Sequence, residues 1–343
     1  MATLAPSVAA IRVAVRRTLT EVRRDRPVLV ACSGGADSLA LAAAAAFVAP
    51  RLGIPVGLVT VDHGLQSGSE QRAVTVAKWA EQAGFAPVEL ATVTVEGRPG
   101  GPEAAARQAR YQALGEVARR HGASAVLLGH TRDDQAETVL LALARGAGPR
   151  GLAGMPFRRE RAGTTLLRPL LEVSREQTRK ACAALGLTPW EDPHNTDPSY
   201  TRARVRADVL PVLVRALGAG VVDNLARTAK LVASDNAALD SLAGDAFEAA
   251  RTADGGLAVP VLAGLPAAIR TRVLHAWSRE LGATPAALSY GHVTSLDALI
   301  TDWHGQGPTH LPGGIQVSRY RDALVALPAD GGPAGGSGGG WDG

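Results

Sequence analysis

Twelve residues, PVLVACSGGADS at positions 27–38, decide the fold of this 343-residue chain. The apolar run at 27–32 ends in Ser33-Gly34-Gly35, and an Ala- and Leu-rich segment follows as far as Pro50. Such a sequence predicts a buried strand, a tight turn and a helix. Glycines in the turn let backbone N–H groups approach an anion closely, and the N-terminus of the helix adds the positive end of its dipole.

The same alternation of strand and helix continues to residue 145. Continuous apolar runs predict further buried strands, and the segments between them predict helices. The strands are expected at 56–61, 87–95 and 123–128, and the helices at 69–83, 103–121 and 132–145. We therefore expect an α/β fold with a doubly wound parallel sheet, whose ligands bind at the carboxyl ends of the strands.

The pattern changes after Trp190. Helices are predicted without comparable strands between them, and a short strand–turn–strand signal follows at 309–317. The helices are expected at 201–217, 221–250, 260–281 and 285–303. We expect three parts: an α/β domain at 1–217, a second, smaller and mostly helical domain at 218–328, and a Gly-rich tail at 329–343 that is predicted to be disordered.

Composition limits the class of protein. The chain is 46% hydrophobic and 20% charged, as folded globular proteins are, and no run of about 18 apolar residues predicts a membrane span. No secretory signal is evident, so we expect a cytoplasmic protein without a membrane partner. Only two cysteines, Cys32 and Cys182, are present, which excludes a disulfide scaffold, a Cys-rich zinc module and a CxxC redox motif.

Positive charge is concentrated in the middle of the chain. Residues 98–230 hold 21 Lys and Arg against 13 Asp and Glu, whereas residues 1–97 and 231–343 carry net charges of +1 and −5. The local excess of +8 indicates contact with a polyanion. The alternative is that this basic stretch is only a solvated surface.

The turn at 33–38 predicts a phosphate site. The hydroxyls of Ser33 and Ser38 and the backbone N–H groups of 34–36 are suitable donors to phosphate oxygens. The loop has no lysine and differs from the GxxxxGK(S/T) motif, which occurs nowhere in the chain. Asp37 fits beside phosphates if it holds a Mg²⁺ ion that bridges them. The alternative is a glycine turn in which Ser and Asp only cap a helix.

A second group of polar residues, GHTRDDQAET at 129–138, starts where the fourth predicted strand ends. His130, Asp134 and Glu137 are expected on one helix face near the ligand edge of the sheet. Two carboxylates there suit a cationic amine, and His130 suits a phosphate contact or a proton transfer. Zinc is disfavoured because a second His or Cys at ligand spacing is missing. The alternative is that the acidic pair at 133–134 only favours the helix N-terminus.

Two sets of arginines are suited to phosphate groups. They are Arg107 and Arg110 beside Tyr111, and Arg202, Arg204 and Arg206. If a helix begins at residue 201, Arg202 and Arg206 share one face and Arg204 points elsewhere. Guanidinium groups bind the phosphates of ATP or of an RNA backbone. The alternative for either set is a salt-bridged helix surface.

The loop SGGADS resembles the pyrophosphate-binding loop of the PP-loop ATPases, which cleave ATP between its α and β phosphates. A longer series of motifs narrows the resemblance to the bacterial tRNA(Ile)-lysidine synthetase family. In unbroken order over about residues 25–212 these motifs are SGGADS, VDHGL (61–65), EAAARQARY (103–111), GHTRDDQAET (129–138), RGAGPRGLAGM (145–155), LLRPLLEVSR (166–175) and WEDPHNTDPSYTRARVR (190–206). The last motif departs from the family's more usual Arg-Asn-Arg-Ile-Arg, because Ala203 replaces the amide.

The resemblance implies an ATP-dependent enzyme that adenylates the wobble cytidine of an isoleucine tRNA with a CAU anticodon. The ε-amine of free lysine then displaces AMP, and lysidine forms. The implied cofactors are ATP and Mg²⁺, and the implied partners are free lysine and tRNA(Ile) with the CAU anticodon. The first domain would be catalytic and the second would bind tRNA, with a homodimer as one possible assembly.

Motif matches also imply roles for individual residues. The residues expected to take part in catalysis are Asp37, Arg110, His130 and Arg202. The residues expected to bind ATP are Ser33, Gly34, Gly35, Ala36, Asp37, Ser38 and His63, with Asp37 also holding the metal. Asp134 and Glu137 would receive lysine. The residues expected to contact tRNA are Arg107, Arg204 and Arg206.

Three other functions remain as alternatives. A tRNA thiolation enzyme on the same loop needs a cysteine pair or an iron–sulfur cluster, for which Cys32 and Cys182 lack a recognisable spacing. A non-catalytic nucleotide-binding module would not need the acidic face at 130–137 together with the basic sets. An amidotransferase-type synthetase would need a glutaminase domain, and no nucleophilic Cys with room for one is visible.

Overall fold

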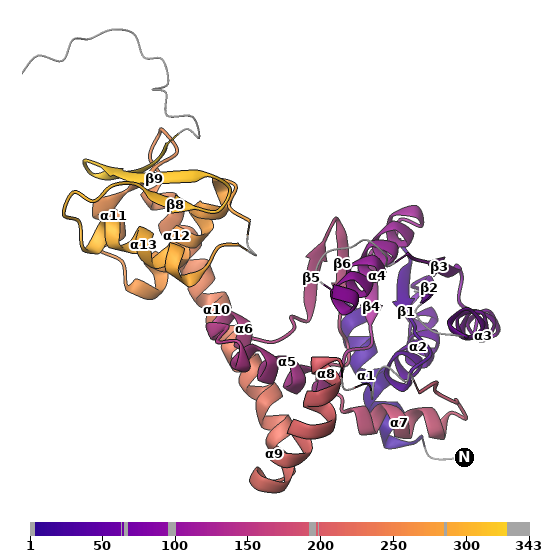
Figure 1. Cartoon of the computed structure of the whole chain (residues 1–343). Coiled ribbons are helices and arrows are strands. Elements are labelled where there is room, and N and C mark those ends of the chain that lie inside the picture. The colour runs from indigo at the N-terminus through magenta and orange to yellow at the C-terminus, as the bar shows by residue number, and fades with distance from the viewer. Residues whose placement is uncertain are drawn as a thin grey trace, which may run out of the picture. The chain divides into compact units, whose positions relative to one another are not determined.

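The computed structural model describes residues 4–62, 64, 68–94, 101–191, 197, 199–284 and 287–327, apart from the side chains of 101–104. His63 and the tail at 329–343 lie outside the described residues. The chain divides into two compact units, Met1–Ala233 and Ser234–Gly343, each of which contains a sheet of its own (Figure 1).

The first unit is built on a six-stranded sheet in the order β3-β2-β1-β4-β6-β5. Its strands are β1 (Val28–Ala31), β2 (Val56–Asp62), β3 (Val88–Thr92), β4 (Ala125–Leu128), β5 (Arg158–Arg161) and β6 (Thr164–Leu167). All neighbours are parallel except β5, which pairs antiparallel with β6 at the edge. The predicted doubly wound α/β fold is confirmed, and each of the four predicted strands is present.

Some helices of this unit cover the two faces of the sheet, and others pack mainly on one another. The helices are α1 (Pro6–Leu19), α2 (Ala36–Val48), α3 (Ser69–Gln82), α4 (Gly101–Arg120), α5 (Arg132–Ala144), α6 (Gly148–Leu152), α7 (Arg175–Ala184), α8 (Thr201–Arg204) and α9 (Leu210–Leu217). Val28 and Val30 join a core shared with α1, α2 and α7, whereas Leu29 joins a core shared with α4. All three side chains are fully buried, which explains the continuous apolar run in the sequence.

The β5–β6 hairpin has no counterpart among the predicted elements. Strand β5 has the sequence RRER and is largely exposed at the sheet edge, so it lacks the apolar residues that mark a strand. Its turn uses Ala162 and Gly163 with φ angles of 48° and 75°, a conformation that alanine rarely adopts. Neither composition nor turn residues therefore reveal this strand.

The second unit packs helices against an antiparallel sheet in the order β7-β10-β9-β8. Its elements are the end of α10 (Val221–Ala250), β7 (Leu257–Ala258), α11 (Val259–Ala263), α12 (Ala267–Glu280), α13 (Tyr290–Thr301), β8 (Thr309–Leu311), β9 (Ile315–Tyr320) and β10 (Ala323–Leu327). In its core Trp277 is 1% exposed and donates from Nε1 to Gly255 O at 3.0 Å. The predicted strand pair at 309–317 corresponds to β8 and β9, which β10 and β7 extend.

Helix α10 runs through the division between the two units. Its first turns belong to the first unit, where Asp223 pairs with Arg132 at 2.9 Å and Lys230 pairs with Glu172 at 2.6 Å. The domain boundary expected between residues 217 and 218 falls in the loop before this helix. In the structure, the two compact units meet within the helix, after Ala233.

Prolines interrupt two of the predicted helices. The segment 260–281 forms two helices because Pro266 precedes α12 and has no N–H to continue α11. The segment 201–217 consists of α8, a π-helical turn (Val205–Val209) and α9, which contains Pro211 in its first turn.

In the described part of the chain, no single helix has the length and hydropathy of a membrane span. The bent pair at 201–217 and 221–250 meets that criterion only by length and composition.

The strand order reverses at the carboxyl ends of β1 and β4. The chain leaves β1 toward β2 and β3 on one side, whereas β4 and β6 lie on the other. The loops after β1 and β4 therefore lie together. A Cβ on Gly129 would lie 3.0 Å from Ser38 N and 3.1 Å from Asp37 O, so a glycine allows the two segments to approach this closely.

We expect Gly129→Ala to lower the free energy of unfolding of the first unit by about 1–3 kcal/mol, because the added methyl group would press on backbone atoms. The control is Gly220→Ala, whose Cβ would meet only Asn224 Nδ2 at 3.9 Å. Hydrogen exchange of the β1 and β4 amides measures this unit separately. Equal protection of these amides against exchange in the two variants would show that the segments at Gly129 and at 37–38 have room for the added methyl group.

Candidate active site

The loop after β1 is held in one conformation by its own hydrogen bonds. Gly34 has a φ of 86°, in the region that favours glycine. Ser38 Oγ accepts from Ser33 N–H at 3.1 Å and donates to Gly35 O at 2.9 Å, and Trp190 N–H donates to Gly34 O at 2.9 Å. No side chain caps the N-terminus of α2. The first N–H groups of the helix are therefore available to an anion.

A pocket of about 450 Å³ opens beside this loop. It is lined by Gly34, by side chains of α3 and by residues 187–190. The Arg72 guanidinium lies over the Trp190 ring, with 3.9 Å between Cζ and the ring centroid. No role is predicted for either residue from the sequence, although Trp190 begins one of the quoted motifs. A largely apolar pocket next to a phosphate loop is suited to the base and ribose of a nucleotide.

Asp37 lies in the first turn of α2, in acidic surroundings. Its carboxylate accepts a hydrogen bond from Thr178 Oγ1, and its Oδ2 lies 3.7 Å from Arg175 Nε. Burial raises the pKa of Asp37 to about 6 against the lowering effect of Thr178, and the negative charge of Asp134 contributes to the rise. An added cation would stabilise the ionised form, so this carboxylate is suited to a metal ion.

Asp134 and Glu137 lie on α5, and both are buried. Asp134 closes a capping box, since its Oδ2 accepts from Thr131 N–H at 2.7 Å and from Thr131 Oγ1 at 2.9 Å. Although burial favours the neutral acid, the charge of Arg175 lowers the pKa of Asp134. Asp134 is therefore an anion whose Oδ2 is already occupied.

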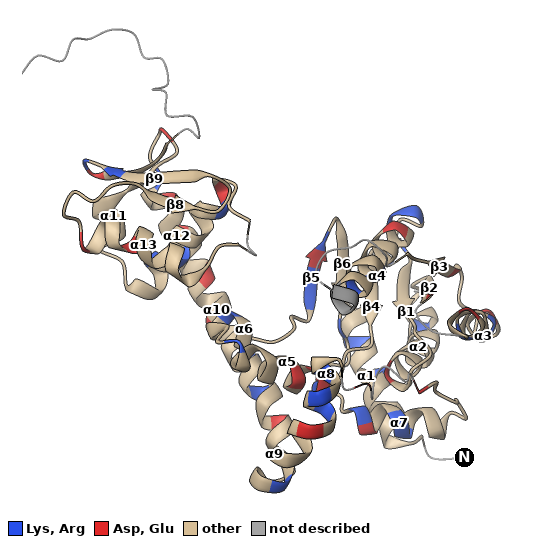
Figure 2. Ribbon diagram, viewed as in Figure 1, with Lys and Arg blue, Asp and Glu red and all other residues tan. Residues whose placement is uncertain are grey.

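Three arginines neutralise Glu137, which has no exposed surface. Arg175 Nη2 and Arg206 Nε lie 3.0 and 2.8 Å from Oε1, and Arg202 Nε lies 2.8 Å from Oε2. Arg202 Nη2 also donates to Asp134 O at 3.0 Å. A buried carboxylate needs such partners because an unpaired charge away from water is strongly destabilising. Figure 2 shows the basic residues of α8 beside acidic residues of α5.

Arg175 joins the phosphate loop to the acidic helix, a role that the sequence does not predict. Its Nη2 donates to Asp134 Oδ1 and to Glu137 Oε1, both at 3.0 Å, and its backbone N–H donates to Asp133 Oδ2 at 2.8 Å. Burial opposes its charge, yet the surrounding carboxylates raise the pKa of Arg175. The available signal is its position directly after Ser174, which caps α7 with its side chain. The capping serine predicts where the helix begins, but it does not show which side chains Arg175 contacts.

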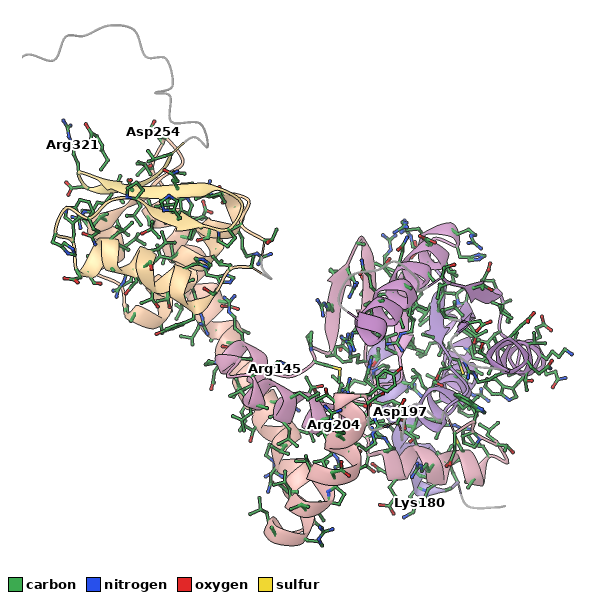
Figure 3. The ribbon with its side chains drawn as sticks, in the orientation of Figure 1. Arg145, Lys180, Asp197, Arg204, Asp254 and Arg321 are labelled. Atoms are coloured by element: carbon green, nitrogen blue, oxygen red, sulfur yellow. The ribbon has the colours of Figure 1, made fainter. Side chains whose placement is uncertain are left out.

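The arginines at 202–206 divide between the interior and the surface. Arg202 and Arg206 both bind Glu137, as expected for one helix face. Arg204 is exposed on α8, where its Nη1 donates to Ser199 O at 3.1 Å (Figure 3). Ala203 is 6% exposed, so the position at which this motif departs from the family pattern faces the interior.

His130 follows β4 and is neutral at pH 7. Burial lowers its pKa to about 3, with Arg110 adding to the effect and Asp134 opposing it. Its Nδ1 is buried and has no hydrogen-bond partner among the residues that the structure describes. The ring is therefore available as a neutral hydrogen-bonding group.

Arg107 and Arg110 lie on α4 beside Tyr111. Each Cζ is 5.4 Å from the centroid of the tyrosine ring. Both side chains are exposed, and neither pairs with a carboxylate within the described ranges. The structure thus brings a carboxylate-rich group and an unpaired basic group to one end of one sheet.

Comparison with known proteins decides the family. Residues 10–213 match the model of the PP-loop domain, and residues 257–325 match that of the TilS substrate binding domain. The tRNA(Ile)-lysidine synthase of Salinispora tropica is 70% identical over 327 residues, which cover 95% of this chain and 98% of the relative. That of Thermobifida fusca is 54% identical over 325 residues, with the same coverage of both chains. The chain belongs to the tRNA(Ile)-lysidine synthase family.

The family confirms the enzyme class predicted from the motifs, and its PP-loop domain indicates that the lysidine synthase uses ATP on a tRNA substrate. Among solved structures, a U34-tRNA thiolase from Methanococcus maripaludis is similar with a TM-score of 0.54 at 18% identity. The match covers 66% of this chain and 80% of the thiolase. At this identity the similarity concerns the fold alone.

The burial of His130 makes a pH-dependent prediction. The unfolded chain binds a proton on this ring below its ordinary pKa of 6.5, whereas the folded chain binds one only near pH 3. Stability is therefore lost as pH falls from 6.5 toward 3, by at most about 2 kcal/mol at pH 5.

We expect His130→Asn to remove this part of the acid sensitivity. Urea unfolding at pH 7.5 and pH 5, followed through the protection of β4 peptides against hydrogen exchange, measures the difference. Parallel losses in the wild type and the variant would mean that the ring is not held neutral by burial.

Proposed function

We propose that this chain ligates lysine to the wobble cytidine of tRNA(Ile) with a CAU anticodon, in two steps at the carboxyl edge of the first sheet. ATP first adenylates the ring carbonyl oxygen of the cytidine with release of pyrophosphate, and the ε-amine of lysine then displaces AMP. Family membership supports the reaction. The observation that carries its location is the meeting of the loop at 33–38 with Asp134 and Glu137 around Arg175.

The phosphate loop would hold the pyrophosphate part of ATP. Free N–H groups at the start of α2 and the hydroxyl of Ser33 are the donors, and the pocket beside Trp190 would take the rest of the nucleotide. The hydroxyl of Ser38 donates to Gly35 O in this structure, so Ser38 would have to turn this hydrogen toward the phosphate to act as a donor. His63 remains a proposed ATP contact. Asp37 would hold Mg²⁺, which usually takes one or two carboxylates and completes its shell with phosphate oxygens and water. Bound there, the metal would neutralise negative charge on the phosphates.

Asp134 and Glu137 would receive the ammonium group of lysine. In the structure Arg175 Nη2 bridges Asp134 Oδ1 and Glu137 Oε1, so an ammonium ion entering there meets a position that a cation already occupies. We propose that lysine shares these oxygens with Arg175 or displaces its Nη2. Asp134 is the more accessible partner, because Glu137 is enclosed by three guanidinium groups.

The tRNA would lie over the basic part of the chain. Arg107 on α4 and Arg204 on α8 are exposed and suit RNA phosphates. Arg110, which is also exposed on α4, would act at the reacting groups, as the motif implies. Arg202 and Arg206 would hold the Glu137 carboxylate in position for the substrate. His130 would contact the reacting groups as a neutral ring. We further propose that the domain at 218–328 binds the tRNA body, that the enzyme is cytoplasmic and uses free lysine, and that a homodimer forms.

Two buried cysteines argue against the alternative of a thiolation enzyme. Cys32 Sγ lies 3.6 Å from Ser38 Oγ, and Cys182 Sγ lies 3.4 Å from Ala36 O. Burial raises the pKa of Cys32, and it raises the pKa of Cys182 to about 11. Both thiols are protonated at pH 7 and are poor nucleophiles.

The test of the proposed function is incubation of the full chain with ATP, labelled lysine and unmodified CAU-anticodon tRNA(Ile). We expect lysine to enter the tRNA with one AMP formed per lysine. Methionine tRNA, which also has a CAU anticodon, serves as the control for recognition beyond the anticodon. AMP formation without lysine incorporation would contradict the proposal.

Asp37→Ala should abolish AMP formation while the fold is retained, because the side chain lies at the ligand edge and contributes little to the core. Chelation of the metal should have the same effect on the wild type. Substantial AMP release by the variant, still dependent on Mg²⁺, would place the metal elsewhere.

Asp134→Asn should separate the two chemical steps. The amide oxygen still accepts from Thr131, so the capping box is kept, but the charge that would hold an ammonium ion is lost. We expect the adenylated tRNA to accumulate and the KM for lysine to rise at least about tenfold, as for the loss of a charge-assisted contact. Asp133→Asn is the control. Failure of Asp134→Asn to form the adenylate at any lysine concentration would assign Asp134 to the ATP site.

A further inference from the structure

A group of buried polar atoms lies beside the proposed lysine site and is not used by the reaction described above. Tyr111 Oη, Arg168 Nε and His130 Nδ1 are each buried and make no hydrogen bond of standard geometry with a described residue, although the Tyr111 hydroxyl and the Arg168 side chain interact with each other. Tyr111 is 6% exposed and Arg168 is 2% exposed. Buried donors and acceptors are nearly always satisfied in folded proteins, so a cluster of unsatisfied ones indicates a ligand or ordered water.

The topology places this cluster at the ligand edge of the sheet. Leu127 of β4 pairs with Leu167 of β6, so Arg168 follows directly at the carboxyl end of β6. His130 follows the neighbouring strand β4, and Tyr111 of α4 packs in the same core as residues of β4 and β6. The three polar groups therefore converge from three elements at the end of the sheet where ligands bind.

The charge of this cluster is positive and lacks a counter-ion. The guanidinium of Arg161 lies 4.6 Å from the Tyr111 ring centroid, and those of Arg107 and Arg110 lie 5.4 Å from it. None of these arginines, nor Arg168, pairs with a carboxylate in the part of the chain that the structure describes. Arg175, Arg202 and Arg206, by contrast, are all bound to Glu137. The cluster is thus suited to an anion.

Arg168 is fixed in position and can act as a preorganised donor. Its Nη1 donates to Pro156 O at 2.7 Å, and its backbone N–H donates to Phe157 O at 2.9 Å. These bonds anchor one side of the side chain and leave Nε, on the side of Tyr111, without a hydrogen bond of standard geometry to any described residue. A guanidinium held in this way loses little freedom when it binds an oxyanion.

We propose that Arg168 and Tyr111 bind the α-carboxylate of lysine while Asp134 and Glu137 receive its ammonium group. The inference rests on the proposed function, since it concerns the same substrate. A carboxylate is favoured over an RNA phosphate because Arg168 is almost completely buried, and a phosphodiester carries a ribose on each side. A free amino acid ends in its carboxylate, so only that small group has to reach the buried guanidinium. The exposed Arg107 remains for RNA.

The two sites flank His130 at the carboxyl ends of neighbouring strands. Asp134 lies in the first turn of α5, directly after His130, and Arg168 follows β6, which pairs with β4. The charges of both residues act on the His130 ring. Lysine carries its two charged ends at opposite ends of a four-carbon side chain. The arrangement therefore selects an amino acid that has both a second amine and a carboxylate.

The experiment compares lysine with lysinamide, which keeps both amines and lacks the carboxylate. The wild type should use lysine with a kcat/KM at least tenfold higher than that for lysinamide. Arg168→Gln should remove this preference by lowering kcat/KM for lysine while that for lysinamide stays within about twofold. Arg168→Lys should restore part of the preference. Arg158→Gln, an exposed arginine of β5 paired with Glu160, is the matched control and should change neither value.

Tyr111→Phe tests the same site independently, in case the Arg168 variants do not fold. Its hydroxyl makes no hydrogen bond of standard geometry in the described chain and interacts with Arg168, so its removal should lower the free energy of unfolding by no more than about 1 kcal/mol. We expect the KM for lysine to rise at least threefold and that for lysinamide to stay constant.

Several results would overturn the inference. Equal use of lysine and lysinamide by the wild type would show that no carboxylate site exists. Equal losses on both substrates in Arg168→Gln, with no effect of Tyr111→Phe, would make Arg168 a structural residue. A change confined to tRNA affinity and its salt dependence would assign the site to RNA phosphate. If the wild type incorporates no lysine at all, the proposed function itself fails.

Discussion

The carboxylate of Glu137 is the charge around which the first unit is organised. It has no exposed surface, and it is bound by Arg175 from the start of α7 and by Arg202 and Arg206 from the segment at 201–209. Removal of Glu137 would leave three partly buried guanidinium groups without the carboxylate that they share, which is destabilising. Segments that are distant in the sequence are therefore tied to the helix after β4, at the point where the strand order reverses.

This network places opposite charges in neighbouring positions along one edge. Carboxylates at 37, 134 and 137 surround Arg175, while Arg107, Arg110 and Arg168 near Tyr111 have no carboxylate partner in the described chain. The charges of both groups act on His130, which burial keeps neutral. The proposed reaction must bring together a polyanionic nucleotide, an RNA and a dicationic amino acid, and the edge offers each of them a group of opposite charge.

Local sequence was sufficient to predict strands β1 to β4, the glycine-rich loop after β1 and the helix face that carries Asp134 and Glu137. Apolar runs, glycines and helical spacing act over a few residues, so they can be recognised in one segment. The role of Arg175 could not be predicted, because its partners lie 38–41 residues away and only the fold brings them together. Strand β5 escaped recognition because an edge strand carries charged side chains. The exposed Arg204 and the half-buried Arg206 are also indistinguishable by residue type.

The most direct test of this account is a double-mutant cycle between Arg175 and Glu137. The free energy of unfolding of the first unit is measured for the wild type, Arg175→Gln, Glu137→Gln and the double variant, from the protection of β4 amides against hydrogen exchange. The account predicts a coupling energy of at least about 1.5 kcal/mol, with the double variant less destabilised than the sum of the single variants. Additive effects within about 0.5 kcal/mol would show that the ion pair does not join α7 to α5 and would contradict the account.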